Sequence, residues 1–161
     1  MVRCKYASAL IALGRAPPAV IPAGRVRIVA ILVVTAETAF MAVILIVEDD
    51  GFLRYDAETM ILGWGHDILS AGDVDEALLL LRSSQQIDAL FTDIHLKKAV
   101  LGGYELAHQA IKLREDLRVL YTTGSTVSDK MKALFVDGAH FLQKPYTRFQ
   151  LQSSVEVLLA P

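Results

Sequence analysis

The residues best suited to chemistry stand in short segments, each directly after an apolar run. Glu48 and Asp49 follow the run Val43–Val47, and Asp93 and Lys144 come after later runs of the same kind. Carboxylates brought close together repel one another unless a cation compensates their charge. Oxygen ligands of this type suit Mg²⁺, which binds through one or two carboxylates, waters and a phosphate. The segments therefore predict a divalent metal site.

Two further residues complete the chemistry that these segments favour. Lys144 places a cation on a flexible stem, which can meet Asp93 at rest and a phosphoryl oxygen afterwards. Thr123 adds a hydroxyl donor after another apolar run. A metal, an ammonium and a hydroxyl around one carboxylate suit in-line transfer of a phosphoryl group onto Asp93. Alone, Glu48–Asp50 would indicate a solvated acidic turn. Because Asp93 and Lys144 also come after apolar runs, a phosphoryl-transfer site is favoured over such a turn.

The elements that must position these residues alternate between strand and helix patterns from Ala42 onward, the rhythm of βα units in a parallel sheet. The apolar runs predict strands at 43–47, 66–70, 89–92, 118–122 and 139–142. Helical patterns predict helices at 52–62, 73–83, 104–115, 128–137 and 147–159. The first helix carries Phe52, Tyr55, Thr59 and Leu62 at helical spacing. We expect one doubly wound α/β sheet, with ligands at the carboxyl ends of its strands.

Four segments resemble the signature segments of two-component response regulator receiver domains. They are Ile44–Asp50 (ILIVEDD), Phe91–Leu96 (FTDIHL), Tyr121–Gly124 (YTTG) and Lys144–Tyr146 (KPY). The resemblance covers about residues 42–159 and implies a flavodoxin-like fold of five βα units with strand order 2-1-3-4-5. It also implies a cis Lys144–Pro145 bond. The loop Lys97–Gly103 departs from the family pattern, because it is about one residue longer and lacks proline.

The resemblance assigns a role to each residue of the predicted site. Asp93 corresponds to the phosphoacceptor and Lys144 to the family lysine. The Mg²⁺ ligands would be Asp49, Asp93 and the backbone carbonyl of His95, with Glu48 acting through water. Thr123 corresponds to the switch hydroxyl and Phe141 to the switch aromatic, although an aromatic residue in a strand can equally serve the core.

The implied function is a phosphorylation-dependent switch that signals by protein contact or phosphorelay. Asp93 would receive its phosphoryl group from a sensor histidine kinase or a phosphotransfer protein, and a homodimer could form through the face of the fourth helix, fifth strand and fifth helix. The downstream protein is unknown. One alternative is an aspartyl-phosphate phosphohydrolase, although His95 stands where such enzymes carry a second acid. The other is a degenerate receiver that serves as a docking module. We expect no enzyme activity beyond self-phosphorylation and self-dephosphorylation.

Composition limits the remaining possibilities. Cys4 is the only cysteine among 161 residues, which excludes an intrachain disulfide and fits a cytoplasmic protein. Residues 1–40 hold five basic residues and one acidic residue, whereas residues 41–161 hold eleven and seventeen. This acidic body argues against a nucleic-acid surface, and the apolar run Ile28–Val34 is too short to span a membrane.

The pattern of the domain begins at Val43, just after Met41. We therefore expect residues 41–161 to form a stand-alone receiver domain. Residues 1–40 would be an extension outside it, either disordered or loosely helical. A natural start at Met41 would remove this extension altogether.

Overall fold

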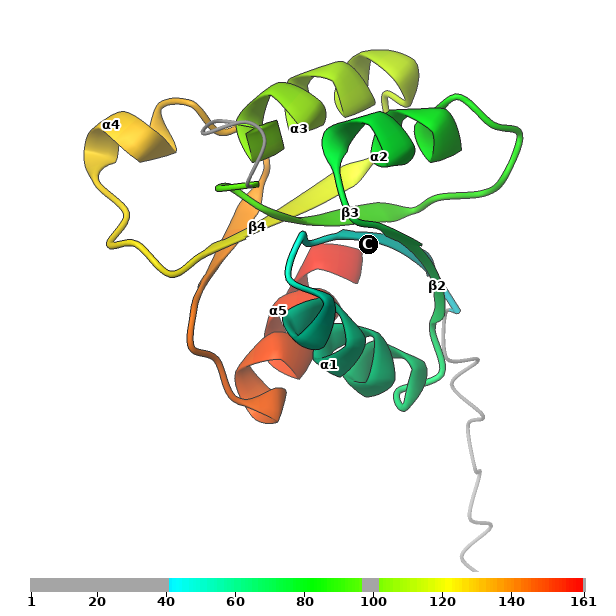
Figure 1. Ribbon diagram of the computed structural model, residues 1–161, viewed down its shortest axis with the longest axis horizontal. Helices are drawn as coiled ribbons and strands as arrows, with labels where there is room; N and C mark the ends of the chain where they lie inside the picture. Colours follow the sequence, from blue (N-terminus) through cyan, green and yellow to red (C-terminus); the bar gives the residue numbers. More distant parts are fainter. Residues whose placement is uncertain (1–40, 97–101, 161) are drawn as a thin grey trace, which may run out of the picture. The chain divides into compact units, whose positions relative to one another are not determined.

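The computed structural model describes residues 41–96 and 102–160 of the chain, and Figure 1 shows a sheet with helices on both sides. The extension 1–40 and most of the loop that departs from the family pattern, residues 97–101, lie outside the described residues. The five strands are all parallel, in the predicted order β2-β1-β3-β4-β5. They are β1 (Val43–Val47), β2 (Asp67–Ala71), β3 (Ala89–Asp93), β4 (Arg118–Thr123) and β5 (His140–Gln143).

The helices are α1 (Gly51–Leu62), α2 (Val74–Leu81), α3 (Gly102–Leu113), α4 (Asp129–Lys132) and α5 (Arg148–Leu159). Helices α1 and α5 cover one face of the sheet, while α2 and α3 cover the other (Figure 1). No helix within residues 41–96 and 102–160 is long and apolar enough to cross a membrane.

Strand β1 explains why the apolar runs are continuous. Ile44 and Ile46 pack into the core on the side of α1 and α5, whereas Leu45 and Val47 pack into the core on the side of α2 and α3. A strand with helices on both faces needs apolar residues at every position. The parallel register then brings the carboxyl ends of β1 and β3 side by side, with Val47 opposite Thr92.

Helix α1 has the predicted bounds to within one residue but buries a different face. Phe52, Tyr55 and Leu62 are exposed, by 88%, 69% and 51%. The residues that α1 buries are Ala57 and Ile61. Phe52, Tyr55 and Leu62 therefore lie on the solvent side of this helix, and Ala57 and Ile61 face the sheet.

Helix α2 begins after Asp73, whose carboxylate caps the helix by accepting a hydrogen bond from the backbone N–H of Glu76. The carboxylate of Glu76 accepts a hydrogen bond from the N–H of Gly72, which ties the start of α2 to the end of β2.

Helix α4 is much shorter than the predicted 128–137, because it ends at Lys132. After that residue, the N–H groups of Leu134 and Phe135 bond carbonyls three residues earlier, at Met131 and Lys132. This tight winding is that of a 3₁₀ turn. Gly138, with φ of 72°, then turns the chain toward β5. The predicted helix is thus one α-helical turn followed by turns.

Candidate functional site

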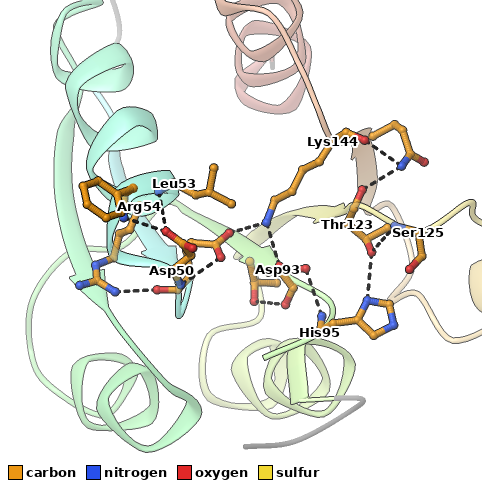
Figure 2. A network of polar contacts seen from close by, with 12 residues as sticks. Asp50, Leu53, Arg54, Asp93, His95, Thr123, Ser125 and Lys144 are labelled. Carbon is orange, nitrogen blue, oxygen red and sulfur yellow. Dashed lines mark hydrogen bonds and ion pairs between the residues drawn. The ribbon is translucent and has the colours of Figure 1, made fainter. Parts of the chain in front are cut away.

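Lys144 joins two of the predicted carboxylates. Its ammonium lies 2.5 Å from Oε2 of Glu48 and 2.8 Å from Oδ2 of Asp93, and Figure 2 shows the side chain reaching from the end of β5 toward Asp93. Its backbone N–H donates to the carbonyl of Thr123 at 2.8 Å. The Lys144–Pro145 bond is cis, as the family resemblance implies. The site therefore draws together the ends of β1, β3, β4 and β5.

Burial strengthens the interactions of Lys144. The exposed fractions of the three side chains are 13% for Lys144, 7% for Glu48 and 12% for Asp93. Burial raises the pKa of Glu48, against the opposing effect of the Lys144 ammonium. Burial alone would lower the pKa of Lys144, but its hydrogen bonds to Asp93 and Glu48 outweigh that effect and raise it. The lysine therefore stays protonated and compensates the carboxylates.

The acidic triple after β1 divides into two functions. Asp50 is the N-cap of α1, because its carboxylate accepts hydrogen bonds from the N–H groups of Phe52 and Leu53. Glu48, Asp49 and Asp93 each offer a carboxylate oxygen, and these oxygens lie within 4.8 Å of one another. Hard oxygen donors at this spacing fit a divalent cation. The residues present are thus a suitable donor set for the predicted metal.

Asp93 is held from several sides at the end of β3. Its Oδ1 accepts a hydrogen bond from the backbone N–H of His95 at 3.1 Å, while Lys144 holds the other oxygen. Gly103 lies directly against the backbone behind Asp93, where an added Cβ would stand 2.1 Å from the Asp93 carbonyl oxygen. Its N–H donates to the carbonyl of Ile94 at 3.2 Å. Only glycine permits this close approach of α3 to β3.

Thr123 ends β4 and is fully buried. Its hydroxyl accepts a hydrogen bond from the backbone N–H of Ser125 at 3.2 Å and lies 3.0 Å from Nδ1 of His95. Phe141, the predicted switch aromatic, is half-buried on β5. Its ring centroid lies 6.1 Å from that of Phe135. The structure therefore places Thr123 at the charged edge, the edge of the sheet that carries Glu48, Asp93 and Lys144. It places Phe141 in a neighbouring aromatic group.

Sequence reasoning missed three contributors to this region. Gly103 was placed only in a loop, although its position after a second glycine was a signal that the backbone must pass closely. Arg54 donates to the carbonyl of Glu48 at 2.6 Å and fixes the turn after β1; no sequence signal pointed to it. Phe135 stacks on Tyr121 with ring centroids 4.5 Å apart. This contact was not foreseen, because Phe135 was placed inside the predicted helix 128–137.

The charged edge opens into a cavity of about 440 Å³, lined in part by Leu53, Gly124 and Tyr146 beside Lys144. Burial and the nearby carboxylates raise the pKa of Tyr146 to about 12, so its phenol remains neutral. The lining also includes Asp56, so the cavity beside Lys144 combines apolar side chains with one carboxylate.

Known proteins with related sequences are regulators. The response regulator receiver domain family matches residues 44–156. The probable transcriptional regulator ycf27 of Porphyridium aerugineum is 26% identical over 116 residues, which make up 72% of this chain and 47% of that protein. The chain thus spans about half the length of the curated relatives it matches.

Solved structures agree with this match. A response regulator receiver protein from Sinorhizobium medicae has a TM-score of 0.68 and 25% identity, covering 74% of this chain and 95% of its own. A response regulator from Burkholderia pseudomallei, with a phosphorylated aspartic acid, a calcium ion and citrate, has a TM-score of 0.64 and 25% identity, covering 74% and 67%. Together with four strand ends that bring Glu48, Asp93, Thr123 and Lys144 to one edge, these matches show that the chain belongs to the response regulator receiver domain family.

Proposed function

We propose that this protein is a phosphorylation-dependent signalling switch of a two-component system, in which Asp93 accepts a phosphoryl group from a sensor histidine kinase or a phosphotransfer protein. The observation that carries the proposal is the arrangement around Asp93. Lys144 and the His95 N–H hold its two carboxylate oxygens, and two further carboxylates stand within ligand distance. The phosphorylated aspartic acid in the Burkholderia pseudomallei relative supports the same chemistry here.

In the proposed reaction, a carboxylate oxygen of Asp93 attacks the phosphorus of a phosphohistidine. The new P–O bond forms as the P–N bond breaks, and the imidazole of the donor departs with its electron pair and takes up a proton. Lys144 offsets the charge on the phosphoryl oxygens, because it already lies 2.8 Å from Asp93. Beside it, the cavity lined by Leu53 and Tyr146 admits the donor group.

We propose Mg²⁺ as the cation of this site. Asp49, Asp93 and the backbone carbonyl of His95 would hold it, with Glu48 acting through a water molecule. When bound, it would supply positive charge to the phosphoryl oxygens. Lys144 also binds Glu48, so the lysine adds positive charge to the same group of carboxylates.

The signal would leave through the face built from α4, β5 and α5. Thr123 bonds a phosphoryl oxygen by moving inward, and Phe141 fills the space that it leaves, which makes the pair a two-state element biased by the phosphate. The recipient is a downstream protein or a second copy of this chain. In this proposal the protein works in the cytoplasm and has no turnover beyond its own phosphorylation and dephosphorylation.

The direct test is to incubate the full chain with a small phosphodonor such as acetyl phosphate and Mg²⁺, and to map the modified residue by mass spectrometry. Asp93→Asn should abolish labelling without unfolding the protein, because the amide has the same shape and relieves carboxylate repulsion. Asp67→Asn is the matched control, since Asp67 is an exposed carboxylate at the start of β2. Undiminished labelling of Asp93→Asn would refute the assignment.

Two further assays, of phosphate release and of Mg²⁺ binding, separate the two alternative functions. Steady release of phosphate from a small phosphomonoester would favour an aspartyl-phosphate phosphohydrolase. Failure to bind Mg²⁺, or failure to accept phosphate from any donor, would favour a degenerate receiver that serves as a docking module.

A further inference from the structure

His95 touches both the phosphoacceptor and the switch hydroxyl, through two different parts of the residue. Its backbone N–H donates to Oδ1 of Asp93 at 3.1 Å. The Nδ1 atom of its ring lies 3.0 Å from the hydroxyl oxygen of Thr123. Figure 2 shows the ring turned toward Thr123 while the backbone nitrogen faces Asp93. The backbone contact is independent of the side chain, but the ring contact requires an imidazole or a similar polar group.

The hydroxyl of Thr123 has two partners in the structure. Its oxygen accepts a hydrogen bond from the N–H of Ser125, and its second partner is the ring of His95. A hydroxyl has one hydrogen to donate, and phosphoryl oxygens only accept. If Nδ1 of His95 is the acceptor, the ring competes with the phosphoryl group for that hydrogen. If Nδ1 carries a proton, the ring holds the hydroxyl oxygen instead. In the first tautomer, binding of a phosphoryl oxygen must break this contact. In the second, the hydroxyl hydrogen is free for the phosphoryl group, and the contact opposes the switch because Thr123 must move inward, away from the ring, to make that bond.

The surroundings of the contact between His95 and Thr123 allow it to break at a modest cost in free energy. Thr123 is fully buried, but His95 is exposed, so water can replace the hydroxyl as a partner of the ring. A neutral hydrogen bond of this kind contributes modestly to an equilibrium. It can therefore bias a two-state element without preventing the change.

We propose that the side chain of His95 is a positioning residue that holds the Thr123 hydroxyl in its unphosphorylated orientation and so opposes the switch. This inference rests on the proposed function. Loss of the ring contact should make the switched conformation easier to reach. The chemistry at Asp93 should persist, because the backbone of His95 and the contacts of Lys144 remain.

The test uses beryllofluoride with Mg²⁺ as a phosphoryl mimic, titrated into the full chain while the amide signals of Thr123 and Phe141 are followed by NMR. His95→Leu removes both ring nitrogens but keeps most of the bulk. His95→Asn returns a polar atom at the same number of bonds from the backbone as Nδ1. We expect His95→Leu to tighten the apparent affinity between about twofold and tenfold, with His95→Asn close to the wild type.

A second background tests whether the effect passes through the hydroxyl. In Thr123→Val, which lacks the hydroxyl, His95→Leu should change the affinity no further, because the two residues act as one pair. The inference is overturned if His95→Leu binds as the wild type does or more weakly. It is overturned equally if Leu and Asn have the same effect, or if the effect persists with Thr123→Val. Labelling of wild-type Asp93 by acetyl phosphate is measured in parallel, so the proposed function can stand when this inference falls.

Discussion

Two neighbouring regions of the molecule are held together in different ways. One is the charged centre, formed by Glu48, Asp93 and Lys144, and the other is the α4 side, formed by residues 124–143. In the charged centre, buried side chains bind one another directly, at 2.5 and 2.8 Å from a single ammonium. On the α4 side the helix is a single turn, and Phe135 and Phe141 are only half-buried. The comparison indicates that direct contacts between buried side chains fix the charged centre, whereas the α4 side has little helix and leaves two of its aromatic rings partly open to solvent.

The largest expected effect would come from disturbing the support of the charged centre at Gly103. Gly103→Ala places a Cβ against the backbone of Asp93 and Ile94, so α3 or the end of β3 must shift. We expect the free energy of unfolding to fall by about 3 kcal/mol, as measured by urea denaturation. Gly51→Ala is the matched control, because nothing lies within 4 Å of its Cβ. Equal stability of the two variants would contradict this account of β3.

Removal of the lysine would break the charged centre itself. Lys144→Met leaves two buried carboxylates without their cation, which should lower the free energy of unfolding by about 3 kcal/mol. Part of the loss should return on addition of Mg²⁺, because the metal replaces the missing charge. Lys132→Met is the control, since Lys132 forms an exposed ion pair with Asp129, and such pairs contribute less than about 1 kcal/mol. A loss that Mg²⁺ does not reduce would argue against metal binding at these carboxylates.

Substitutions at the neighbouring residues Asp49 and Asp50 should separate an effect on metal binding from an effect on stability. Asp49→Ala should weaken Mg²⁺ binding tenfold or more, which corresponds to about 1.4 kcal/mol. Asp50→Ala should instead lower the stability of the protein by about 1 kcal/mol, because Asp50 caps α1. Mg²⁺ titrations followed by NMR and urea unfolding give the two quantities separately. Equal losses of metal affinity would mean that the acidic pair is assigned one residue out of place.

The order of the sheet and the position of its charged edge could be predicted from the sequence because both follow from local patterns. A strand buried on two faces must be apolar throughout, as in Val43–Val47. The residue after each such strand must then lie at one edge of the sheet. Asp49, Asp93 and Lys144 could be placed at that edge because each comes within two residues of the end of a predicted strand.

Packing decided what the sequence could not show. In α1 the spacing of Phe52, Tyr55 and Leu62 indicated an apolar face, yet the helix buries Ala57 and Ile61. A large side chain does not establish which side of a helix faces the sheet. After α4, the chain winds as a 3₁₀ turn where a continuing α-helix was predicted. In this arrangement Phe135 stacks on Tyr121. The two helices therefore differ from the prediction in different ways. Helix α4 is shorter than its local preference predicts, whereas α1 has the predicted length and only its buried face differs.

The most direct test of the comparison is to map the amide signals of the full chain by NMR before and after phosphorylation of Asp93. We expect the amide signals of residues 123–143 to change. The signals of helix α2, which follows the edge strand β2 at the opposite end of the sheet from β5, should stay unchanged. Thr123→Ala should still accept phosphate, because Lys144 and Asp93 are intact, but should lose most of the changes at Phe141 and α4. Shifts confined to the immediate neighbours of Asp93, or a full response in Thr123→Ala, would contradict the account.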